Sequence, residues 1–283
     1  MKIDRIETRT VRYPEPNNDG KMRSLCFARV ETDDGVVGWG EAITGGPVVS
    51  LATAFVIRHR LAPIVLGRDP RDVAGAWGAM RDATYWDGNG GIVSFGISAI
   101  DMALWDIAGK IAGQPLYALL GGRQRERVPA CASIILATDD LDRIGREYAS
   151  FAEGGYRFVK GGWGHDLSIA FGLDESRDLA VARAVREAIG PDTEMILDVV
   201  ALAGWDSSQA IRMCRQLDEE NRLYWFEDAL TEQDIDGWRR LHAAVDTRLC
   251  TGEKGWHAAH FGTLIDSAAV DVIMVDPGKA EGV

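Results

Sequence analysis

Met195-Ile196-Leu197-Asp198, Leu223-Tyr224-Trp225-Phe226-Glu227 and Leu249-Cys250-Thr251-Gly252-Glu253 are three short apolar runs, and each ends in an acidic residue. Amphipathic segments separate the runs, a pattern that predicts buried parallel strands alternating with helices. The acids follow one another at intervals close to the roughly 30 residues of a βαβ unit. Because each unit ends its strand at the same edge of the sheet, we expect the acids to meet at one rim of a barrel, where barrel enzymes keep their active sites.

Two further runs extend the series on either side. Phe158-Val159 leads into Lys160, and Val272-Ile273-Met274-Val275 leads into Asp276. A single acid at a strand end is usually a helix N-cap or a salt-bridge partner, but five charged strand ends in register favour a shared site. Three converging carboxylates suit a hard cation such as Mg²⁺, which takes oxygen ligands in near-octahedral geometry.

Length and composition limit the class of protein. The 283 residues are 46% hydrophobic, enough to bury a large core in one large domain or two smaller ones. The net charge of −12 argues against nucleic acid and anionic membrane surfaces as partners. The four cysteines are scattered without CxxC spacing. The N-terminus lacks the apolar core of a secretory signal, and no uninterrupted run of about 18 apolar residues occurs. We therefore expect a soluble, cytoplasmic protein with no membrane or nucleic-acid partner.

The first part of the chain predicts a small α+β domain. Alternating patterns predict strands over residues 3–13, 24–31 and 36–42, and an Asp-Gly turn joins the last two as a hairpin. A polar loop over residues 14–23 separates the first two strands. Helical patterns follow over residues 49–80 and 97–111. We place this domain at residues 1–125 and begin the barrel domain, residues 126–283, after a short linker.

The second part alternates strands with helices. A strand is expected over residues 128–135, and helices over residues 141–153, 176–189, 207–219, 234–244 and 258–267. Six strands are counted in all, whereas a closed barrel needs eight and about 250 residues. We therefore expect the last strands of the barrel to lie outside this sequence.

Several motifs along the chain resemble one known family. They are Thr32-Asp33-Asp34-Gly35 followed by Gly38-Trp39-Gly40-Glu41, the helix Ala99-Ile100-Asp101-Met102-Ala103-Leu104-Trp105-Asp106-Ile107-Ala108-Gly109-Lys110, then Pro115 and Leu119-Leu120-Gly121-Gly122, and the five charged strand ends. Together these motifs resemble the enolase superfamily, in its mandelate racemase subgroup, over nearly the whole chain. The resemblance implies an α/β fold, with an N-terminal α+β capping domain followed by a modified TIM barrel, (β/α)₇β, whose last strands are missing from this sequence.

The resemblance also implies a metal and a base. By the family pattern, Asp198, Glu227 and Glu253 are the three Mg²⁺ ligands, and the metal binds the substrate carboxylate and stabilises the enediolate formed when the α-proton leaves. Asp276 is expected to orient a catalytic histidine, whose place at the end of a seventh strand lies beyond Val283. Glu rather than Asp at position 253, and Asp276 rather than a lysine on the sixth strand, favour this subgroup over the muconate-lactonizing one, which places a catalytic lysine on that strand.

One departure from the family pattern bears on the reaction. The second strand commonly ends Lys-x-Lys, with the later lysine as a base, but here the segment is Lys160-Gly161-Gly162. Lys160 is then a fixed cation that contacts the substrate carboxylate or enediolate, or is itself the base. Racemisation normally needs a base on each face of the substrate, whereas a dehydratase manages with one histidine.

The resemblance therefore implies an Mg²⁺-dependent acid sugar dehydratase, a hydro-lyase that removes the α-proton and eliminates the β-hydroxide to give a 2-keto-3-deoxy acid. The alternatives are a racemase, epimerase or cycloisomerase of the same superfamily, and a non-catalytic, metal-binding relative. The expected partners are a small-molecule sugar acid and further copies of the chain in a homo-oligomer.

Five residues are expected to bind the substrate. If the capping-domain analogy holds, Lys21, Arg23 and Thr44 cover it, although the two basic residues have an alternative as solvated loop charges. The family pattern also places a basic residue at Lys279, and His165 lies in a loop that follows Lys160. His257 and His260 have the spacing of a metal pair, but we interpret them as surface or helix-start residues.

Overall fold

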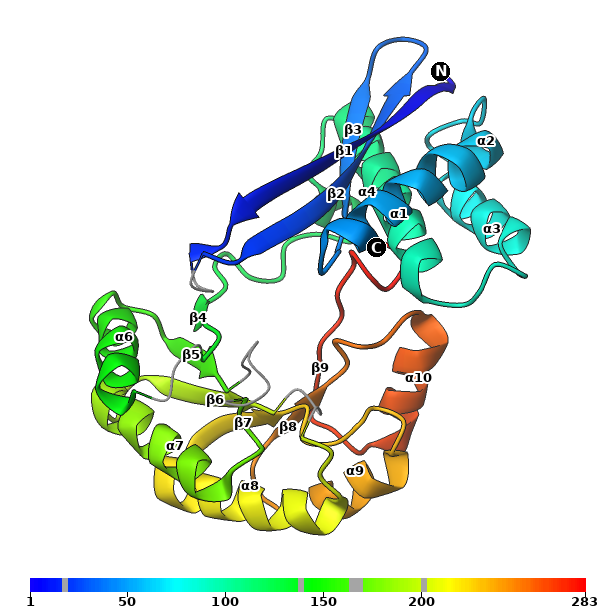
Figure 1. Ribbon diagram of the computed structural model, residues 1–283. Helices are drawn as coiled ribbons and strands as arrows, with labels where there is room; N and C mark the ends of the chain where they lie inside the picture. The colour runs from blue at the N-terminus through cyan, green and yellow to red at the C-terminus, as the bar shows by residue number, and fades with distance from the viewer. Residues whose placement is uncertain (17–19, 137–139, 163–169, 200–202) are drawn as a thin grey trace.

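The computed structural model describes residues 1–16, 20–136, 140–162, 170–199 and 203–283. In this part of the chain, three antiparallel strands form one sheet in the order β1-β2-β3, and six parallel strands form a second sheet in the order β4-β5-β6-β7-β8-β9. Figure 1 shows the two sheets in separate halves of the molecule. The strands of the first sheet are β1 (Ile3–Pro14), β2 (Met22–Thr32) and β3 (Val37–Ala42). Those of the second sheet are β4 (Cys131–Ser133), β5 (Phe158–Gly161), β6 (Glu194–Asp198), β7 (Leu223–Glu227), β8 (Leu249–Thr251) and β9 (Val272–Ile273).

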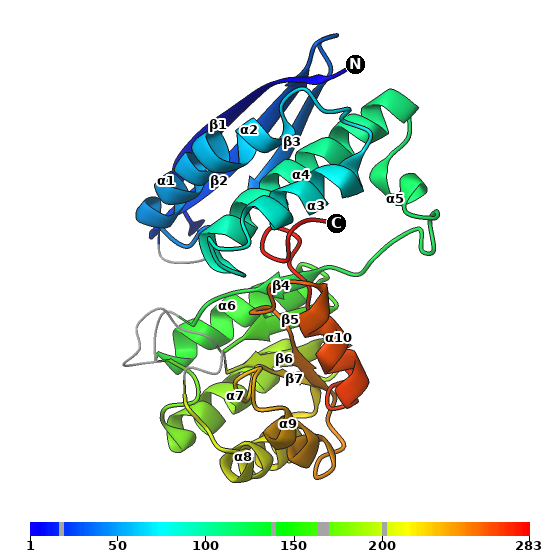
Figure 2. The same ribbon diagram turned by 90° about the vertical axis from the view of Figure 1, so that its right-hand side faces the viewer.

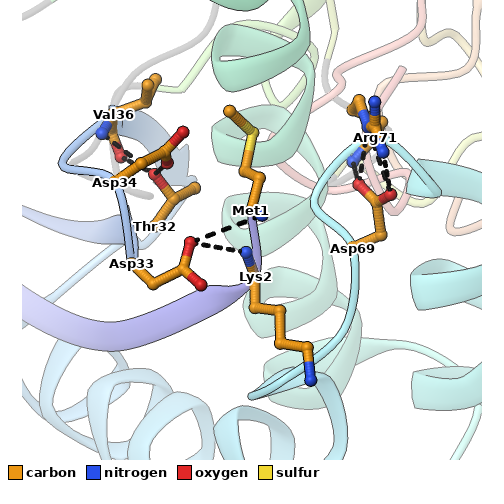
Figure 3. Close-up of polar contacts among 8 residues, drawn as sticks. All are labelled: Met1, Lys2, Thr32, Asp33, Asp34, Val36, Asp69 and Arg71. Carbon is orange, nitrogen blue, oxygen red and sulfur yellow. Dashed lines mark hydrogen bonds and ion pairs between the residues drawn. The ribbon is translucent and has the colours of Figure 1, made fainter.

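The turn between β2 and β3 is fixed by its own side chains, as Figure 3 shows. The Thr32 hydroxyl donates to Asp34 Oδ1 at 2.6 Å and accepts from the Val36 amide at 2.9 Å. Asp33 Oδ1 accepts from the amide of Lys2 at 2.9 Å. Side chains that bond nearby backbone groups in this way favour turns over strands. The Thr-Asp-Asp-Gly motif therefore closes the hairpin and ties it to the N-terminus.

Two glycines of β3 let a long helix lie directly on the sheet. A Cβ at Gly38 would stand 2.1 Å from the carbonyl oxygen of Ala103, and one at Gly40 would stand 2.0 Å from that of Ala99. Both carbonyls belong to α4 (Gly91–Ala112). Only glycine permits so close an approach of two backbones.

The remaining helices of this half are α1 (Pro47–Val56), a π-helical turn (Ile57–Leu61), α2 (Ala62–Val65), α3 (Val73–Ala83) and α5 (Leu116–Leu119). By length and composition alone, the continuous helix over Pro47–Val65 and α4 would each reach across a membrane. Instead, α4 carries core residues such as Ile100, Leu104 and Ile107 and packs on β3. An apolar helix that is buried in this way is the core helix of a globular domain.

Five helices cover the outer side of the parallel sheet (Figures 1 and 2). They are α6 (Leu141–Glu153), α7 (Glu175–Ile189), α8 (Ser207–Asn221), α9 (Ile235–His242) and α10 (Ala258–Ser267). The first four begin at an aspartate whose carboxylate accepts from the amide three residues later: Asp140, Asp174, Asp206 and Asp234. Such N-caps stabilise a helix by about 1 kcal/mol each.

Each sheet has its own hydrophobic core. One core joins the first sheet to α1, α3 and α4, and the other joins the alternate residues of β4–β8 to helices α6–α9. The boundary at residues 125 and 126 stays a prediction. Among the strands, the first barrel strand is shorter than expected, because Val128, Pro129 and Ala130 are exposed and only residues 131–133 join the ladder. The predicted capping fold and parallel barrel-like sheet are confirmed.

Candidate active site

Three charged side chains meet at the carboxyl ends of β5, β6 and β7. Lys160 Nζ lies 2.9 Å from Asp198 Oδ2 and also donates to Glu227 Oε1. Asp198 and Glu227 are paired directly across β6 and β7. Both carboxylates are buried, with side chains 7% and 0% exposed. We call Lys160, Asp198 and Glu227 the inner cluster.

The close contacts and the burial within the inner cluster shift the pKa values of Glu227 and Lys160. Burial, and then the charge of Asp198, raise the pKa of Glu227 to about 7, against the opposing effects of Lys160 and the Trp225 indole. Burial alone would lower the pKa of Lys160, but the two carboxylates together outweigh it and raise that pKa. The cluster thus concentrates negative charge that a cation stabilises.

Glu253 extends the acidic edge from the next strand. It follows β8 by two residues, after Gly252, whose φ of +127° turns the chain. Burial raises the pKa of Glu253, and the charge of Asp198 raises it further. The Glu253 carboxylate therefore lies within electrostatic reach of the inner cluster.

The donor chemistry of this edge fits a hard divalent cation. Asp198, Glu227 and Glu253 supply carboxylate oxygens, the ligands that Mg²⁺ prefers. Within the described residues, no three His, Cys, Asp or Glu side chains stand as a ready-made metal-binding group. Lys160 instead provides the positive charge between two of the acids.

Sequence reasoning missed a neighbour of this cluster. The Trp225 indole N–H donates to Glu227 Oε2 at 3.0 Å, on the side of the carboxylate that Lys160 does not use. The two residues stand two positions apart on β7, so they share one face of the strand. The two-residue period of a strand was the sequence signal that could have placed Trp225 beside Glu227. Both line a cavity of about 610 Å³ on the inner side of the sheet, as does Lys160.

A second cavity, of about 520 Å³, lies between the two halves of the molecule and collects most of the predicted substrate-binding residues. Its lining includes Lys21, Arg23, Thr44, Glu253 and Lys279. The same lining contains three residues to which the sequence did not point: Glu15, Phe95 and Trp256. No sequence pattern linked these residues to the barrel rim.

The contacts within this second cavity differ from residue to residue. Arg23 pairs with Glu15 at 2.9 Å. The buried Thr44 hydroxyl donates to the carbonyl of Ser24 at 2.7 Å and shares a hydrogen bond with Ser50. Lys279 Nζ donates to the carbonyl of Glu253 at 2.6 Å and lies over the Trp256 ring.

Asp276 lies at the start of the segment that follows β9. Its Oδ1 accepts from the Gly278 amide at 2.8 Å, and its charge helps to raise the pKa of Glu41, after the main effect of burial. Asp276 therefore lies near the end of β3 in the capping half. His165 lies outside the described residues.

A separate set of charges, which we call the outer cluster, lies beside the inner one. Asp228 accepts from the Thr251 hydroxyl at 2.7 Å and lies 3.6 Å from Lys254 Nζ. Glu232 accepts from the Lys254 amide at 2.7 Å and pairs with His260 Nε2 at 2.9 Å. His257 instead contacts Asn89. His257 and His260 thus have different partners.

Comparison with known proteins shows the family of the chain. Residues 17–121 match the mandelate racemase / muconate lactonizing enzyme N-terminal domain, and residues 143–283 match the enolase C-terminal domain-like family. The chain is 32% identical to a D-galactarolactone cycloisomerase of Agrobacterium fabrum, covering 98% of this chain and 71% of that protein. It is 30% identical to an arabinonate dehydratase of Saccharolobus solfataricus, covering 89% of this chain and 65% of that protein.

A solved structure agrees in fold. The 3,6-anhydro-D-galactonate cycloisomerase of Zobellia galactanivorans superimposes with a TM-score of 0.87 at 27% identity, covering 100% of this chain and 74% of that one. The chain thus spans about two thirds to three quarters of the length of these proteins. On both its N-terminal and C-terminal parts, it belongs to the mandelate racemase / muconate lactonizing enzyme family of the enolase superfamily.

Proposed function

We propose that this protein is an Mg²⁺-dependent dehydratase of sugar acids. The observation that carries the proposal is the inner cluster, with two buried carboxylates around Lys160 at adjacent strand ends and Glu253 beside them. Relatives named as dehydratases support the reaction type. The basic residues that line the cavity above the rim support an anionic substrate.

Asp198, Glu227 and Glu253 are the residues that would hold the cation. When bound there, Mg²⁺ supplies positive charge to the substrate carboxylate and to the negative charge that develops as the α-proton leaves, an effect worth several kcal/mol.

The basic residues of the chain bind and orient the substrate. Lys160 presents an ammonium group at the rim, where it meets the carboxylate end of the substrate. Lys279 is held by the Glu253 carbonyl and the Trp256 ring at the edge of the cavity between the two halves. Lys21 and Arg23 contact the distal hydroxyls or a distal carboxylate from the capping half.

The reaction breaks two bonds of the substrate. The C–H bond α to the carboxylate loses its proton, and its electrons form the carbon–carbon double bond as the β-hydroxyl leaves with a proton as water. The resulting enol gains a proton at carbon and loses its hydroxyl proton, which gives a 2-keto-3-deoxy acid. Asp276 orients the histidine that moves these protons and so fixes its tautomer. The family pattern places this histidine on a later strand.

A cycloisomerase is the second candidate, because two of the similar proteins carry that name. It shares the first step, removal of the α-proton, and differs in the group that leaves. A racemase or epimerase would return the proton to the same carbon. A non-catalytic, metal-binding relative would take no step at all.

One experiment separates these functions. The protein is incubated with Mg²⁺ and a library of mono- and diacid sugars and their lactones in D₂O, and the products are analysed by mass spectrometry and NMR. Loss of water from one or a few acids is the expected result and identifies the substrate. Deuterium uptake without loss of water and without ring opening contradicts the dehydratase and supports a racemase or epimerase. Ring opening of a sugar lactone supports the cycloisomerase, and no change of any compound supports the non-catalytic relative.

A further inference from the structure

The segment Pro277–Val283 leaves the barrel half and ends against the capping half. Figures 1 and 2 show it rising from β9 to the helices of the capping half. There it meets Ser94, Ser98 and Asp101 of α4, which recur at helical spacing and so share one face. Asp101 belongs to the helix motif that pointed to the family, yet the proposed chemistry gives this motif no role.

Glu281 is the most constrained residue of this segment. Its side chain is 2% exposed, accepts from the Ser94 hydroxyl at 2.6 Å and lies 3.0 Å from Arg81 Nη1. Its own amide donates to the Ser98 hydroxyl at 2.9 Å. The backbone φ is +74°, a conformation that costs a non-glycine residue free energy and persists only where its surroundings enforce it.

The next two residues are held by Asp101. Its Oδ2 accepts from the Val283 amide at 2.9 Å. Gly282 has a φ of +107°, and a Cβ there would stand 2.0 Å from the same Asp101 oxygen. The carboxylate of Asp101 therefore occupies the space that only a glycine leaves open.

The other end of the segment carries two residues of the proposed site. The amides of Lys279 and Ala280 both donate to the carbonyl of Asp276, at 3.0 and 2.8 Å. The carbonyl of Gly278 accepts from the Ile43 amide of the capping half at 3.2 Å. Only one residue separates Lys279 from Glu281, so a displacement of Glu281 moves the lysine.

We propose that Glu281 is a positioning residue, which Ser94, Ser98 and Arg81 of the capping half hold in place so that Lys279 and Asp276 keep their positions at the barrel rim. The inference rests on the proposed function for the roles of Lys279 and Asp276, and on the contacts above for their placement. It assigns a task to the α4 motif: the face that carries Ser94, Ser98 and Asp101 orders a loop of the other half.

The test measures the order of the segment directly. Hydrogen–deuterium exchange is followed by mass spectrometry in the peptide that covers residues 277–283, for the wild type and the variants Ser94→Ala, Glu281→Ala and Glu281→Gln. We expect exchange at least about tenfold faster in the two alanine variants, because each removes a hydrogen bond to a buried charged group. Glu281→Gln keeps an acceptor for Ser94, so its exchange should stay nearer to that of the wild type.

The control is Ser207→Ala. Ser207 is a buried serine of α8 that accepts from Arg240 Nε at 3.0 Å, far from this segment in sequence. Exchange in residues 277–283 should not change in this variant. Unchanged exchange in both Ser94→Ala and Glu281→Ala would overturn the proposal, and so would an equal increase in Ser207→Ala.

A second readout separates positioning from simple packing. On the substrate identified above, Glu281→Ala should lower kcat/KM at least about tenfold, with partial recovery in Glu281→Gln and none of this loss in Ser207→Ala. Faster exchange with unchanged kcat/KM would overturn the positioning role. If the wild type acts on no sugar acid, the proposed function fails, and the exchange measurement alone then decides whether Glu281 fixes the segment.

Discussion

Two residues that are adjacent in the sequence belong to two clusters of charges, and the carboxylates of these clusters have different kinds of partner. Glu227 belongs to the inner cluster and Asp228, the next residue, to the outer one. A φ of +49° at Asp228 turns the chain between them. Both carboxylates are buried, and burial raises both pKa values, to about 7 for Glu227 and about 6 for Asp228.

The difference lies in the partners. The inner carboxylates share the ammonium group of Lys160, and Glu227 and Lys160 line a cavity. The outer carboxylates are held by a hydroxyl, a backbone amide and the side chains of Lys254 and His260. Burial of charge alone therefore does not identify a catalytic site. An acid whose charge is balanced mainly by one side chain beside a cavity has the better claim to bind a metal.

The largest effect, a loss of turnover, is expected for Glu227→Gln. This variant keeps the shape of the side chain but removes the charge that would hold Mg²⁺. Turnover should fall by at least about 10³-fold, since a bound cation contributes several kcal/mol. Steady-state kinetics with Mg²⁺ measures the loss, and circular dichroism checks the fold. Unchanged activity would remove Glu227 from the ligand set.

Lys160→Met tests which cluster binds the cation. Loss of the ammonium removes the ion pair that two buried carboxylates share, which should cost about 3–5 kcal/mol of unfolding free energy. Saturating Mg²⁺ should restore much of this loss, because a ligand that binds only the folded state stabilises it. Thermal unfolding with and without Mg²⁺ measures both quantities.

The matched control for that variant is Lys254→Met in the outer cluster. Its pair with Asp228 is longer, at 3.6 Å, and the Lys254 side chain is 35% exposed. We expect a cost of about 1 kcal/mol or less, with no selective recovery in Mg²⁺. Equal recovery of both lysine variants would contradict a metal site confined to the inner cluster.

Asp101→Asn extends the comparison to a buried carboxylate of the capping half. Burial raises the pKa of Asp101 from 3.8 to about 6, against the opposing bond from the Val283 amide. The folded state therefore binds this proton more tightly than the unfolded state, and the wild type loses stability as the pH rises from about 4 to about 6.

The asparagine variant lacks this titration. Over the same pH range, the wild type should lose about 3 kcal/mol relative to the variant, at roughly 1.4 kcal/mol per pKa unit. Urea unfolding at several pH values measures the difference. Parallel pH profiles of the two proteins would show that Asp101 does not titrate in this range.

The smallest effect is expected for Asp228→Asn. The amide oxygen still accepts from the Thr251 hydroxyl, and the change removes a buried charge, so the unfolding free energy should shift by about 1 kcal/mol or less. The turnover should stay within about threefold of the wild type. A loss as large as that of Glu227→Gln would mean that the two clusters act as one site.

Much of the fold could be predicted from the sequence, because local patterns carried it. Helices α6 and α10 have the predicted bounds, Leu141–Glu153 and Ala258–Ser267. The predicted strands of the first sheet match β1, β2 and β3 within two residues. By contrast, α4 begins at Gly91, six residues before the predicted start, since residues 91–96 include two glycines and a serine rather than strong helix formers.

The site could be predicted only in part. Period and strand register brought Lys160, Asp198 and Glu227 together, as the spacing of the strands predicted. No such rule predicts contacts between the two halves. The cavity that joins Arg23 to Lys279 and the contact of Ser94 with Glu281 depend on how the capping half lies on the barrel. The roles of all these residues stay predictions.

The contact of Gly38 and Gly40 with α4 gives a structural reason for two of the family motifs, residues 38–41 and residues 99–110. The glycines and the carbonyls of Ala99 and Ala103 form a steric match between two backbones, and no group in it touches the rim. Any side chain at Gly38 or Gly40 would therefore clash with the backbone of α4. Shared motifs of this kind mark common descent of the scaffold. By contrast, Lys21, Arg23 and Lys279 line a cavity, so their side chains are in a position to meet a ligand.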